Sequence, residues 1–226
     1  MVTTLLFDLD DTLYEQWTYY VQVHKAVANY IANKYQKDPQ KIQKKALAIL
    51  KKYGSEYGHI YNDILNEEKF YSPKKLSELI NYYRNFKPKI KLYPDFKEIL
   101  PILEKKYKLG IITNGVPLVQ KNKCESLKIA KRFSLILFTR ELGKKNEKPN
   151  FLPFRIALKK LKSKFYETVY IGDNPYKDFQ GAKKLNIKTI RILRGEYKYQ
   201  KETLPNLIDY EITNYNKKFL NLIENI

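Results

Sequence analysis

The sequence predicts an α/β fold with a mostly parallel sheet, interrupted near the N-terminus by a helical insertion. From Leu92 onward, short apolar runs alternate with helical patterns, as expected for successive strand–helix units. Residues 15–91 show helical spacing and no convincing alternating strand. The 226 residues, 43% of them hydrophobic, suffice for one sizeable core and a smaller unit. We therefore expect residues 1–14 and 92–226 to form the core and residues 15–91 a separate helical domain.

The first predicted strand begins at Thr3 and leads directly into three acids, Asp8, Asp10 and Asp11. Carboxylates at the end of a buried strand repel one another and lose hydration unless a cation or donors compensate. In an extended backbone, Asp8 and Asp10 would point to the same side, where a hard divalent cation such as Mg²⁺ would stabilise them. A solvated acidic turn or a helix N-terminus explains this stretch alone equally well.

The insertion is predicted to hold three or four helices between Tyr14 and about Lys91. Two start signals are visible, Asp38 before Pro39 and Ser72 before Pro73, each an N-cap followed by proline in the first turn. The apolar positions that recur at helical spacing include Val21, Val27, Ile31, Ile42, Ala46 and Ile49. Aromatic residues at the start of the first helix are interpreted as packing between helices rather than as an entrance to a site: Trp17, Tyr19, Tyr20 and, with them, His24.

The remaining chain is predicted as alternating elements. Helices are expected from Pro94 to Leu103, from Pro117 to about Leu127, from Phe154 to Leu161, at Ala182–Leu185 and at the C-terminus. Strands are expected in the run 109–113, in 135–138, in the run from Thr168, in 188–192 and, as an edge strand, in 210–213.

Polar residues close three of these apolar runs. They are Asp8 and Asp10, Thr113 and Asn114, and Asp173. In an open parallel sheet, ligands bind beyond the carboxyl ends of the strands, so these side chains are expected to converge on one rim. Each also fits a turn or a helix cap, but three strand ends carrying suitable groups favour a site.

Composition narrows the function classes. The single cysteine, Cys124, excludes an internal disulfide and a cysteine-rich zinc site, and only two histidines are present, His24 and His59. No apolar run has the length of a membrane span and no signal peptide is visible, so a cytoplasmic protein with no membrane partner is expected. The formal charge of +19 is compatible with an anionic partner such as nucleic acid, but we attribute it to a Lys-rich composition.

The motifs together resemble those of the haloacid dehalogenase-like (HAD) hydrolases, in particular the phosphatase branch with an α-helical cap inserted after the first motif. The four motifs occur in the family's order and span most of the chain: Asp8-Leu9-Asp10-Asp11-Thr12-Leu13, then Thr113-Asn114-Gly115, then Lys148-Pro149 with Phe154 and Ala157-Leu158, then Gly172-Asp173-Asn174-Pro175 through Asp178 to Gly181-Ala182. One departure is Asn150-Phe151, where the family often has Asp-Pro. Lys144 and Lys145 are rivals of Lys148, and the spacing to Phe154 favours Lys148.

The resemblance implies a Rossmann-like core, a cap formed by residues 15–91, and Mg²⁺-dependent hydrolysis of a small phosphorylated metabolite through an aspartyl-phosphate. By this resemblance, Asp8 is the nucleophile and a metal ligand, and Asp10 is the general acid–base and offers its backbone carbonyl to the metal. Asp173 is a further metal ligand, and Asp178 contacts the metal through water or orients Lys148. Thr113 and Lys148 bind the phosphoryl group, and Asn114 and Gly115 are donors near the phosphate.

An acid at position 10 favours phosphoryl chemistry over dehalogenation, since dehalogenating members resemble this pattern but lack it. A phosphomutase of the same fold shares these motifs and stays an alternative. A nucleic-acid-binding protein on an inactive version of the fold is an alternative of a different class, supported only by the charge. Phosphoglycolate, glyceraldehyde 3-phosphate and nucleoside monophosphates are all compatible substrates, and the sequence leaves the oligomeric state open.

Overall fold

The computed structural model describes residues 1–201 and 204–226, and the chain folds as two compact units. One unit consists of Met1–Gln16 and Lys91–Ile226, and the other of Trp17–Ile90. The first unit contains the sheet and the second contains helices only among the residues described.

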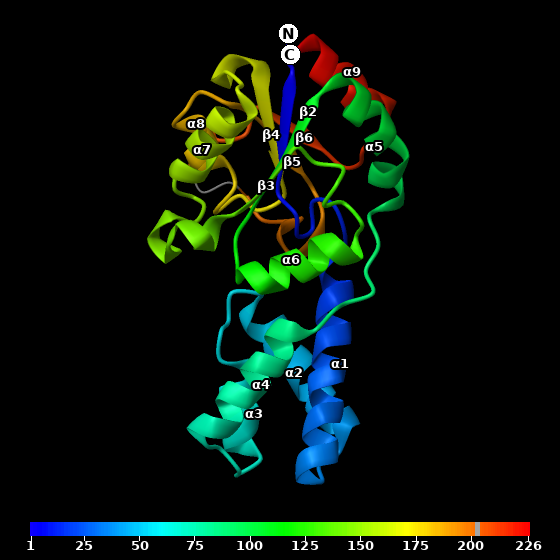
Figure 1. Cartoon of the computed structure of the whole chain (residues 1–226), viewed down its shortest axis with the longest axis vertical. Coiled ribbons are helices and arrows are strands. Elements are labelled where there is room, and N and C mark those ends of the chain that lie inside the picture. The colour runs from blue at the N-terminus through cyan, green and yellow to red at the C-terminus, as the bar shows by residue number, and fades with distance from the viewer. Residues whose placement is uncertain (202–203) are drawn as a thin grey trace. The chain divides into compact units, whose positions relative to one another are not determined.

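The first unit is built on a six-stranded sheet in the order β3-β2-β1-β4-β5-β6 (Figure 1). Every neighbouring pair of strands is parallel. This confirms the predicted α/β class with a parallel sheet. The strands are β1 (Thr4–Phe7), β2 (Lys108–Thr113), β3 (Leu135–Phe138), β4 (Thr168–Gly172), β5 (Lys188–Ile192) and β6 (Tyr210–Ile212).

Helices cover both faces of this sheet, because a parallel sheet must bury both. Successive residues of β1 point to opposite faces: Leu6 joins a cluster with Phe154 and Phe179, whereas Phe7 packs against Phe96 and Tyr215. Figure 1 shows α7 and α8 on the first face and α5 and α9 on the second. The helices of this unit are α5 (Pro94–Lys106), α6 (Pro117–Ser126), α7 (Leu152–Leu161), α8 (Phe179–Lys183) and α9 (Lys217–Asn225). Short 3-10 turns lie at Thr139–Leu142, Lys144–Asn146, Phe165–Glu167 and Gly195–Tyr197.

The strand order places the predicted site residues at a point where the chain changes direction across the sheet. After β1 the chain adds β2 and β3 on one side, then returns to place β4, β5 and β6 on the other. A crevice forms beyond the carboxyl ends of the strands at such a switch point. Asp8 follows β1, Thr113 ends β2 and Asp173 follows β4, so these three residues share this edge of the sheet.

The second unit consists of four helices, α1 (Gln16–Tyr35), α2 (Pro39–Tyr53), α3 (Ile60–Glu67) and α4 (Pro73–Asn85). The predicted caps are present: the Asp38 carboxylate accepts hydrogen bonds from the amides of Gln40 and Lys41, and the Ser72 hydroxyl accepts one from Lys75. The core of this unit includes Val27, Ile31, Ile42, Ala46, Ile64 and Leu79.

The aromatic residues of α1 lie in packed surroundings, as their packing interpretation predicts. Tyr19 and His24 are buried, and Trp17 and Tyr20 pack partly buried against the core of the second unit. The Nδ1 atom of His24 lies 2.9 Å from the Tyr61 hydroxyl. Burial lowers the pKa of His24 to about 4, so this imidazole is neutral at physiological pH.

The first helix begins at Gln16 and not at Tyr14, where helical spacing had placed it. Tyr14 instead forms isolated backbone bridges with Asp10 and with Leu92, and these tertiary contacts override the local helical pattern. For the other elements given a predicted range, the predicted and observed ends differ by at most three residues. Among the residues that the structure describes, no helix is both long and apolar enough to cross a membrane.

Candidate active site

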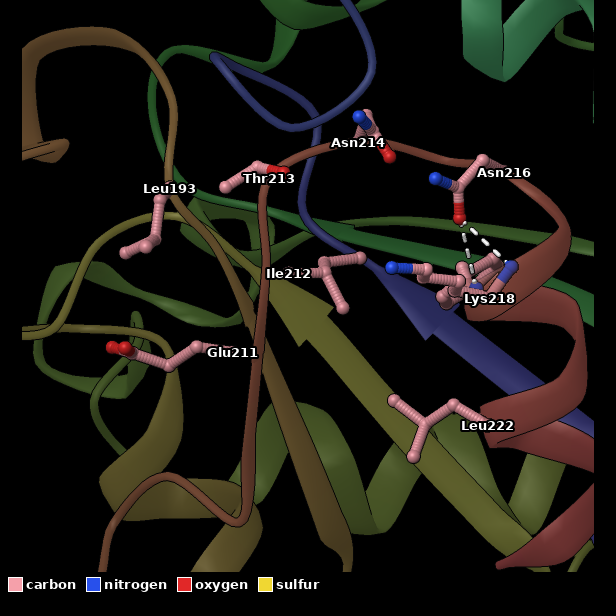
Figure 2. Close-up of a pocket in the computed structure, with 9 residues that line it drawn as sticks. Leu193, Glu211, Ile212, Thr213, Asn214, Asn216, Lys218 and Leu222 are labelled. Carbon is pink, nitrogen blue, oxygen red and sulfur yellow. Dashed lines mark hydrogen bonds between the residues drawn. The ribbon is translucent and has the colours of Figure 1, made fainter.

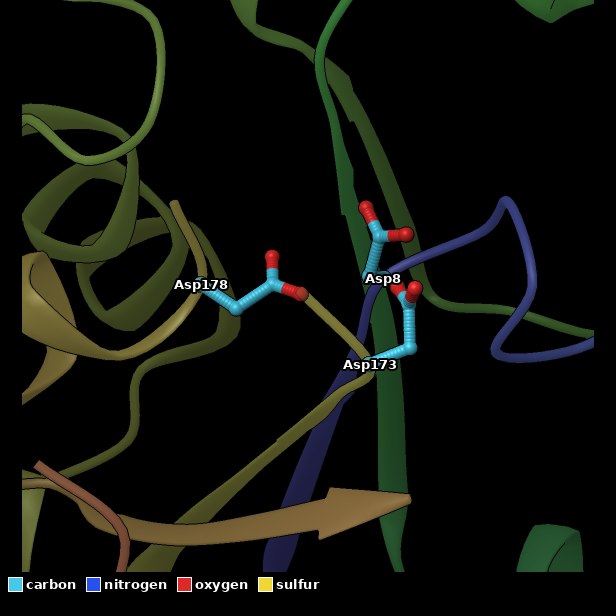
Figure 3. Close-up of side chains that lie close together, drawn as sticks. All are labelled: Asp8, Asp173 and Asp178. Atoms are coloured by element: carbon cyan, nitrogen blue, oxygen red, sulfur yellow. The ribbon is translucent and has the colours of Figure 1, made fainter. Parts of the chain in front are cut away.

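Three buried carboxylates meet at the carboxyl ends of β1 and β4. Oxygen atoms of Asp8, Asp173 and Asp178 lie within 4.8 Å of one another. Figure 3 shows the carboxyl groups of Asp8 and Asp173 next to each other, with Asp178 facing them from the loop after β4. All three side chains are buried, so water cannot fully solvate their charge.

Lys148 places a buried ammonium group against this cluster. Its Nζ atom donates hydrogen bonds to Asp8 Oδ1 at 2.5 Å and to Asp178 Oδ1 at 2.7 Å. The Lys148 side chain is buried, whereas the rivals Lys144 and Lys145 are exposed. The structure therefore places the lysine favoured by its spacing against Asp8, the predicted nucleophile.

Two acids of the cluster, Asp8 and Asp173, hold their protons more tightly than free carboxyl groups do, because the pKa of each is raised. Burial is the main cause that raises the pKa of Asp8 to about 7, with Lys148 opposing and Asp178 and Asp10 adding to it. Burial also raises the pKa of Asp173 well above its ordinary value, and repulsion from Asp178 and Asp8 acts in the same direction. The same neighbouring carboxylates outweigh burial at Lys148 and raise its pKa.

This electrostatic imbalance suits a divalent cation. Three ionised carboxylates and one ammonium group carry a formal net charge of −2, which one divalent cation would neutralise. The donors are all carboxylate oxygens, the ligands that hard divalent cations prefer. Charge and donor type therefore agree that a hard divalent cation fits here.

The three acids differ in how much of their hydrogen-bonding capacity is already used. Asp178 Oδ1 accepts from Lys148 and from the Tyr170 hydroxyl, and its Oδ2 accepts from the Asn174 amide at 2.9 Å. Asp173 accepts only a long contact of 3.4 Å, from the Thr12 hydroxyl, among its side-chain hydrogen bonds in the described residues. Asp173 is thus the acid better placed to bind a cation directly, and Asp178 the one better placed to orient Lys148.

The turn after β2 connects the second motif to the third. The Asn114 side chain accepts a hydrogen bond from the Lys148 amide at 3.0 Å and donates one to the Lys148 carbonyl at 2.9 Å. Gly115 has φ of 112°, a conformation that favours glycine, and its amide donates to Glu147 at 3.1 Å. The side chain of Asn114 and the amide of Gly115 therefore hold the Lys148 loop in place in this structure.

The Asp10 carboxylate does not join the three-acid cluster. Lys123 Nζ lies 2.7 Å from its Oδ1 atom, Gln120 Nε2 lies 2.8 Å from its Oδ2 atom, and the Tyr14 hydroxyl also donates to it. Burial would raise the pKa of Asp10, but the charge and hydrogen bond of Lys123, followed by the hydrogen bonds of Tyr14 and Gln120, lower it. Asp10 is therefore ionised at neutral pH in this arrangement.

Several residues that contact the site were not predicted from the sequence. Tyr170 in β4 and Arg191 in β5 were interpreted only as strand residues, yet the Tyr170 hydroxyl contacts Lys148 at 2.8 Å and Arg191 donates to the carbonyl of Asp173 at 3.4 Å. Gln120 and Lys123 were interpreted only as part of a helix. For Tyr170 and Arg191 the available signal was a polar side chain in the middle of a strand of the predicted parallel sheet, since burying such a side chain requires a partner.

A hollow of about 420 Å³ lies near the start of α9 and is lined by Leu193, Glu211, Ile212, Asn216 and Phe219 among others. None of the predicted site residues lines it. Figure 2 shows the Asn216 side chain turned to the first turn of α9, where it accepts from the amides of Lys218 and Phe219. Charged side chains do not converge in this hollow as they do in the cluster of Asp8, Asp173, Asp178 and Lys148.

Comparison with known proteins agrees with this geometry. The family model described as haloacid dehalogenase-like hydrolase matches residues 5–192. A glyceraldehyde 3-phosphate phosphatase from Methanocaldococcus jannaschii is 32% identical over 231 residues, which cover 100% of this chain and 99% of that protein.

Solved structures share the fold. A 2-haloacid dehalogenase from Pseudomonas syringae superposes with a TM-score of 0.70 at 23% identity and covers 100% of both chains. A HAD-type hydrolase, YfnB from Bacillus subtilis, solved bound to magnesium, superposes with a TM-score of 0.67 at 21% identity, covering 100% of this chain and 99% of that one.

Proposed function

The chain belongs to the haloacid dehalogenase-like hydrolases and is an enzyme of the phosphatase branch, and we propose that it uses Mg²⁺ and an aspartyl-phosphate on Asp8 to hydrolyse a small phosphate monoester. The observation that carries this proposal is the contact of 2.5 Å between Lys148 and Asp8 inside a cluster of buried acids. A carboxylate is a poor nucleophile toward a phosphate dianion unless nearby cations neutralise both partners.

In the first step, an Asp8 oxygen attacks phosphorus, a P–O bond to Asp8 forms and the P–O bond to the leaving group breaks. Lys148 compensates negative charge on Asp8 and on the transferring phosphoryl group, and the Thr113 hydroxyl donates to a phosphoryl oxygen. Asp10 gives its proton to the leaving oxygen. Repulsion by the bound phosphate dianion would raise the pKa of Asp10 and so favour the protonated form for this step.

In the second step, ionised Asp10 takes a proton from water, and the water oxygen attacks phosphorus. The P–O bond to Asp8 breaks, which regenerates the carboxylate and releases inorganic phosphate. Asp10, reprotonated by this water, is ready to protonate the next leaving group. The low pKa of Asp10 beside Lys123 and Tyr14 provides the ionised form that this step requires.

We propose that the Asp8 carboxylate, the Asp10 backbone carbonyl and Asp173 hold the Mg²⁺, with Asp178 orienting Lys148. The ion, when bound, supplies positive charge that stabilises the negative charge developing on the phosphoryl oxygens. The oxygen-only donor set and the formal charge of −2 of the cluster support this assignment.

For the substrate, we propose a small phosphorylated metabolite, with glyceraldehyde 3-phosphate as the first compound to test because the relative of nearly equal length carries that name. We further propose that residues 17–90 form the cap whose residues select the leaving group. Their helical fold around a separate core supports an independent role.

The proposal is tested by measuring phosphate release from a panel of phosphate monoesters with and without Mg²⁺. The panel includes glyceraldehyde 3-phosphate, phosphoglycolate, nucleoside monophosphates and an aryl phosphate. We expect Mg²⁺-dependent turnover that Asp8→Asn abolishes, with the exposed Lys121→Met as the matched control. Turnover of no monoester by the wild-type protein, or full activity of Asp8→Asn, would overturn it.

A further inference from the structure

Helix α6 contributes two buried polar side chains that lie outside the four motifs. Gln120 is 2% exposed and Lys123 is 3% exposed. Their spacing of three residues places both on one face of the helix. Lysine and glutamine are seldom buried to this degree without a partner, so their partners indicate what the burial achieves.

Both oxygens of the Asp10 carboxylate are engaged by these two residues. Lys123 Nζ contacts Oδ1 at 2.7 Å, and Gln120 Nε2 contacts Oδ2 at 2.8 Å. Tyr14 also donates to Oδ1. A carboxylate held at both oxygens cannot rotate about its last bond without breaking a charged or a neutral hydrogen bond. The orientation of Asp10 is therefore determined largely by α6.

Gln120 also controls the Thr113 hydroxyl. Its Nε2 atom lies 2.6 Å from Thr113 Oγ1, and an amide nitrogen can only donate. The Thr113 oxygen is thus the acceptor, and its own proton points elsewhere. The hydrogen bond that the Thr113 hydroxyl itself donates, to the carbonyl of Asn114, is long at 3.4 Å. The hydroxyl proton is consequently available for a stronger acceptor, such as a phosphoryl oxygen.

We propose that Gln120 and Lys123 are positioning residues, which fix the Asp10 carboxylate for proton transfer and direct the Thr113 hydroxyl to the phosphoryl group. This inference rests on the proposed function and adds two residues to it. A purely structural role predicts lower stability and nothing specific to the reaction. A positioning role predicts an effect that depends on how much the leaving group needs a proton.

The test compares kcat/KM for an alkyl phosphate, such as glyceraldehyde 3-phosphate, with kcat/KM for an aryl phosphate whose leaving group departs without a proton. This quantity covers only the steps up to departure of the leaving group, whereas hydrolysis of the aspartyl-phosphate, in which Asp10 is the proposed base, is common to both esters. The variants are Gln120→Met, Lys123→Met and Lys123→Arg, and the control is Lys121→Met on the exposed face of the same helix. We expect Gln120→Met and Lys123→Met to lower kcat/KM for the alkyl phosphate by about tenfold or more, within the usual range for loss of an acid–base contribution.

The aryl phosphate should lose distinctly less activity than the alkyl phosphate, and Lys123→Arg, which keeps the charge, should recover part of the loss. Equal losses on both esters, or no loss on either, would overturn the inference. If Lys123→Met does not fold, Gln120→Met decides by the same criterion, because it leaves the ion pair intact. If the wild type and Lys121→Met turn over no ester at all, the proposed function fails and this inference fails with it.

Discussion

Replacing Asp8 with asparagine should stabilise the metal-free protein at alkaline pH, although it removes the proposed nucleophile. Asparagine keeps the size of the side chain and deletes one negative charge from a buried cluster of three acids. In the wild type, burial together with Asp178 and Asp10 raises the pKa of Asp8 to about 7 from its reference value of 3.8, even with Lys148 opposing. The folded cluster therefore disfavours the ionised form of Asp8.

The size of the effect follows from proton linkage. Because the folded state binds this proton more tightly than the unfolded state, stability falls as pH rises from 3.8 to about 7. This loss of unfolding free energy is complete above pH 7 and absent below pH 3.8. The difference between the two pKa values corresponds to about 4 kcal/mol at ~1.4 kcal/mol per pKa unit. Asp8→Asn should thus raise the free energy of unfolding by up to about 4 kcal/mol at pH 8, and by about 2 kcal/mol or less at pH 5.

The assay is urea unfolding in EDTA at pH 8 and pH 5, with Glu125→Gln as the control because Glu125 is an exposed acid on α6. Adding Mg²⁺ at about 100 times its dissociation constant should stabilise the wild type by about 3 kcal/mol and Asp8→Asn by much less. A raised pKa of Asp8 in the folded protein is refuted if Asp8→Asn is no more stable than the wild type in EDTA at pH 8, or if its gain in stability is larger at pH 5.

Three further outcomes are expected. Asp10→Asn should lower kcat/KM, which covers only the steps up to departure of the leaving group, by about 10²-fold or more for esters with poor leaving groups and by less for aryl phosphates, as measured by phosphate release; equal losses in kcat/KM would remove the role of general acid from Asp10. Asp173→Asn should raise the Mg²⁺ concentration for half-maximal activity at least about tenfold, since it deletes one proposed metal ligand, and an unchanged Mg²⁺ titration would contradict that role. Despite the formal charge of +19, nucleic-acid binding should be weak and lost with rising salt, as a filter-binding titration can measure, while hydrolysis of small esters persists; tight binding to one sequence at physiological salt, without ester turnover, would favour the nucleic-acid alternative.

The fold was predictable because its signals are local. Apolar runs of strand length, and the pairs Asp38-Pro39 and Ser72-Pro73, correspond to β-strands and to the helix starts that the structure contains. The convergence of Asp8 and Asp173 was predictable from topology, since parallel strands end at one edge of the sheet. Tyr14 shows the limit of local patterns, because its contacts with Asp10 and Leu92 are tertiary.

The surroundings of Asp10 could not be predicted from the sequence. Asp8 and Asp10 would point to the same side only in an extended backbone, but β1 ends at Phe7 and the Asp10 carboxylate contacts α6. Lys123 could not be singled out from the sequence, because in a chain with 43 Lys and Arg residues a lysine on a helix is expected to face solvent. Only the packing of α6 against the Asp10 loop distinguishes Lys123 from the exposed Lys121 beside it.

In the proposed mechanism the phosphoryl group is transferred to Asp8 before it reaches water. Rapid quenching of the wild type during turnover, followed by borohydride reduction and mass spectrometry of the peptides, tests this transfer. Reduction converts an aspartyl-phosphate to homoserine, and we expect homoserine at position 8 only when substrate and Mg²⁺ are both present. Homoserine at another position, or an unmodified Asp8 while the leaving-group alcohol is released in a burst ahead of phosphate, would contradict this mechanism.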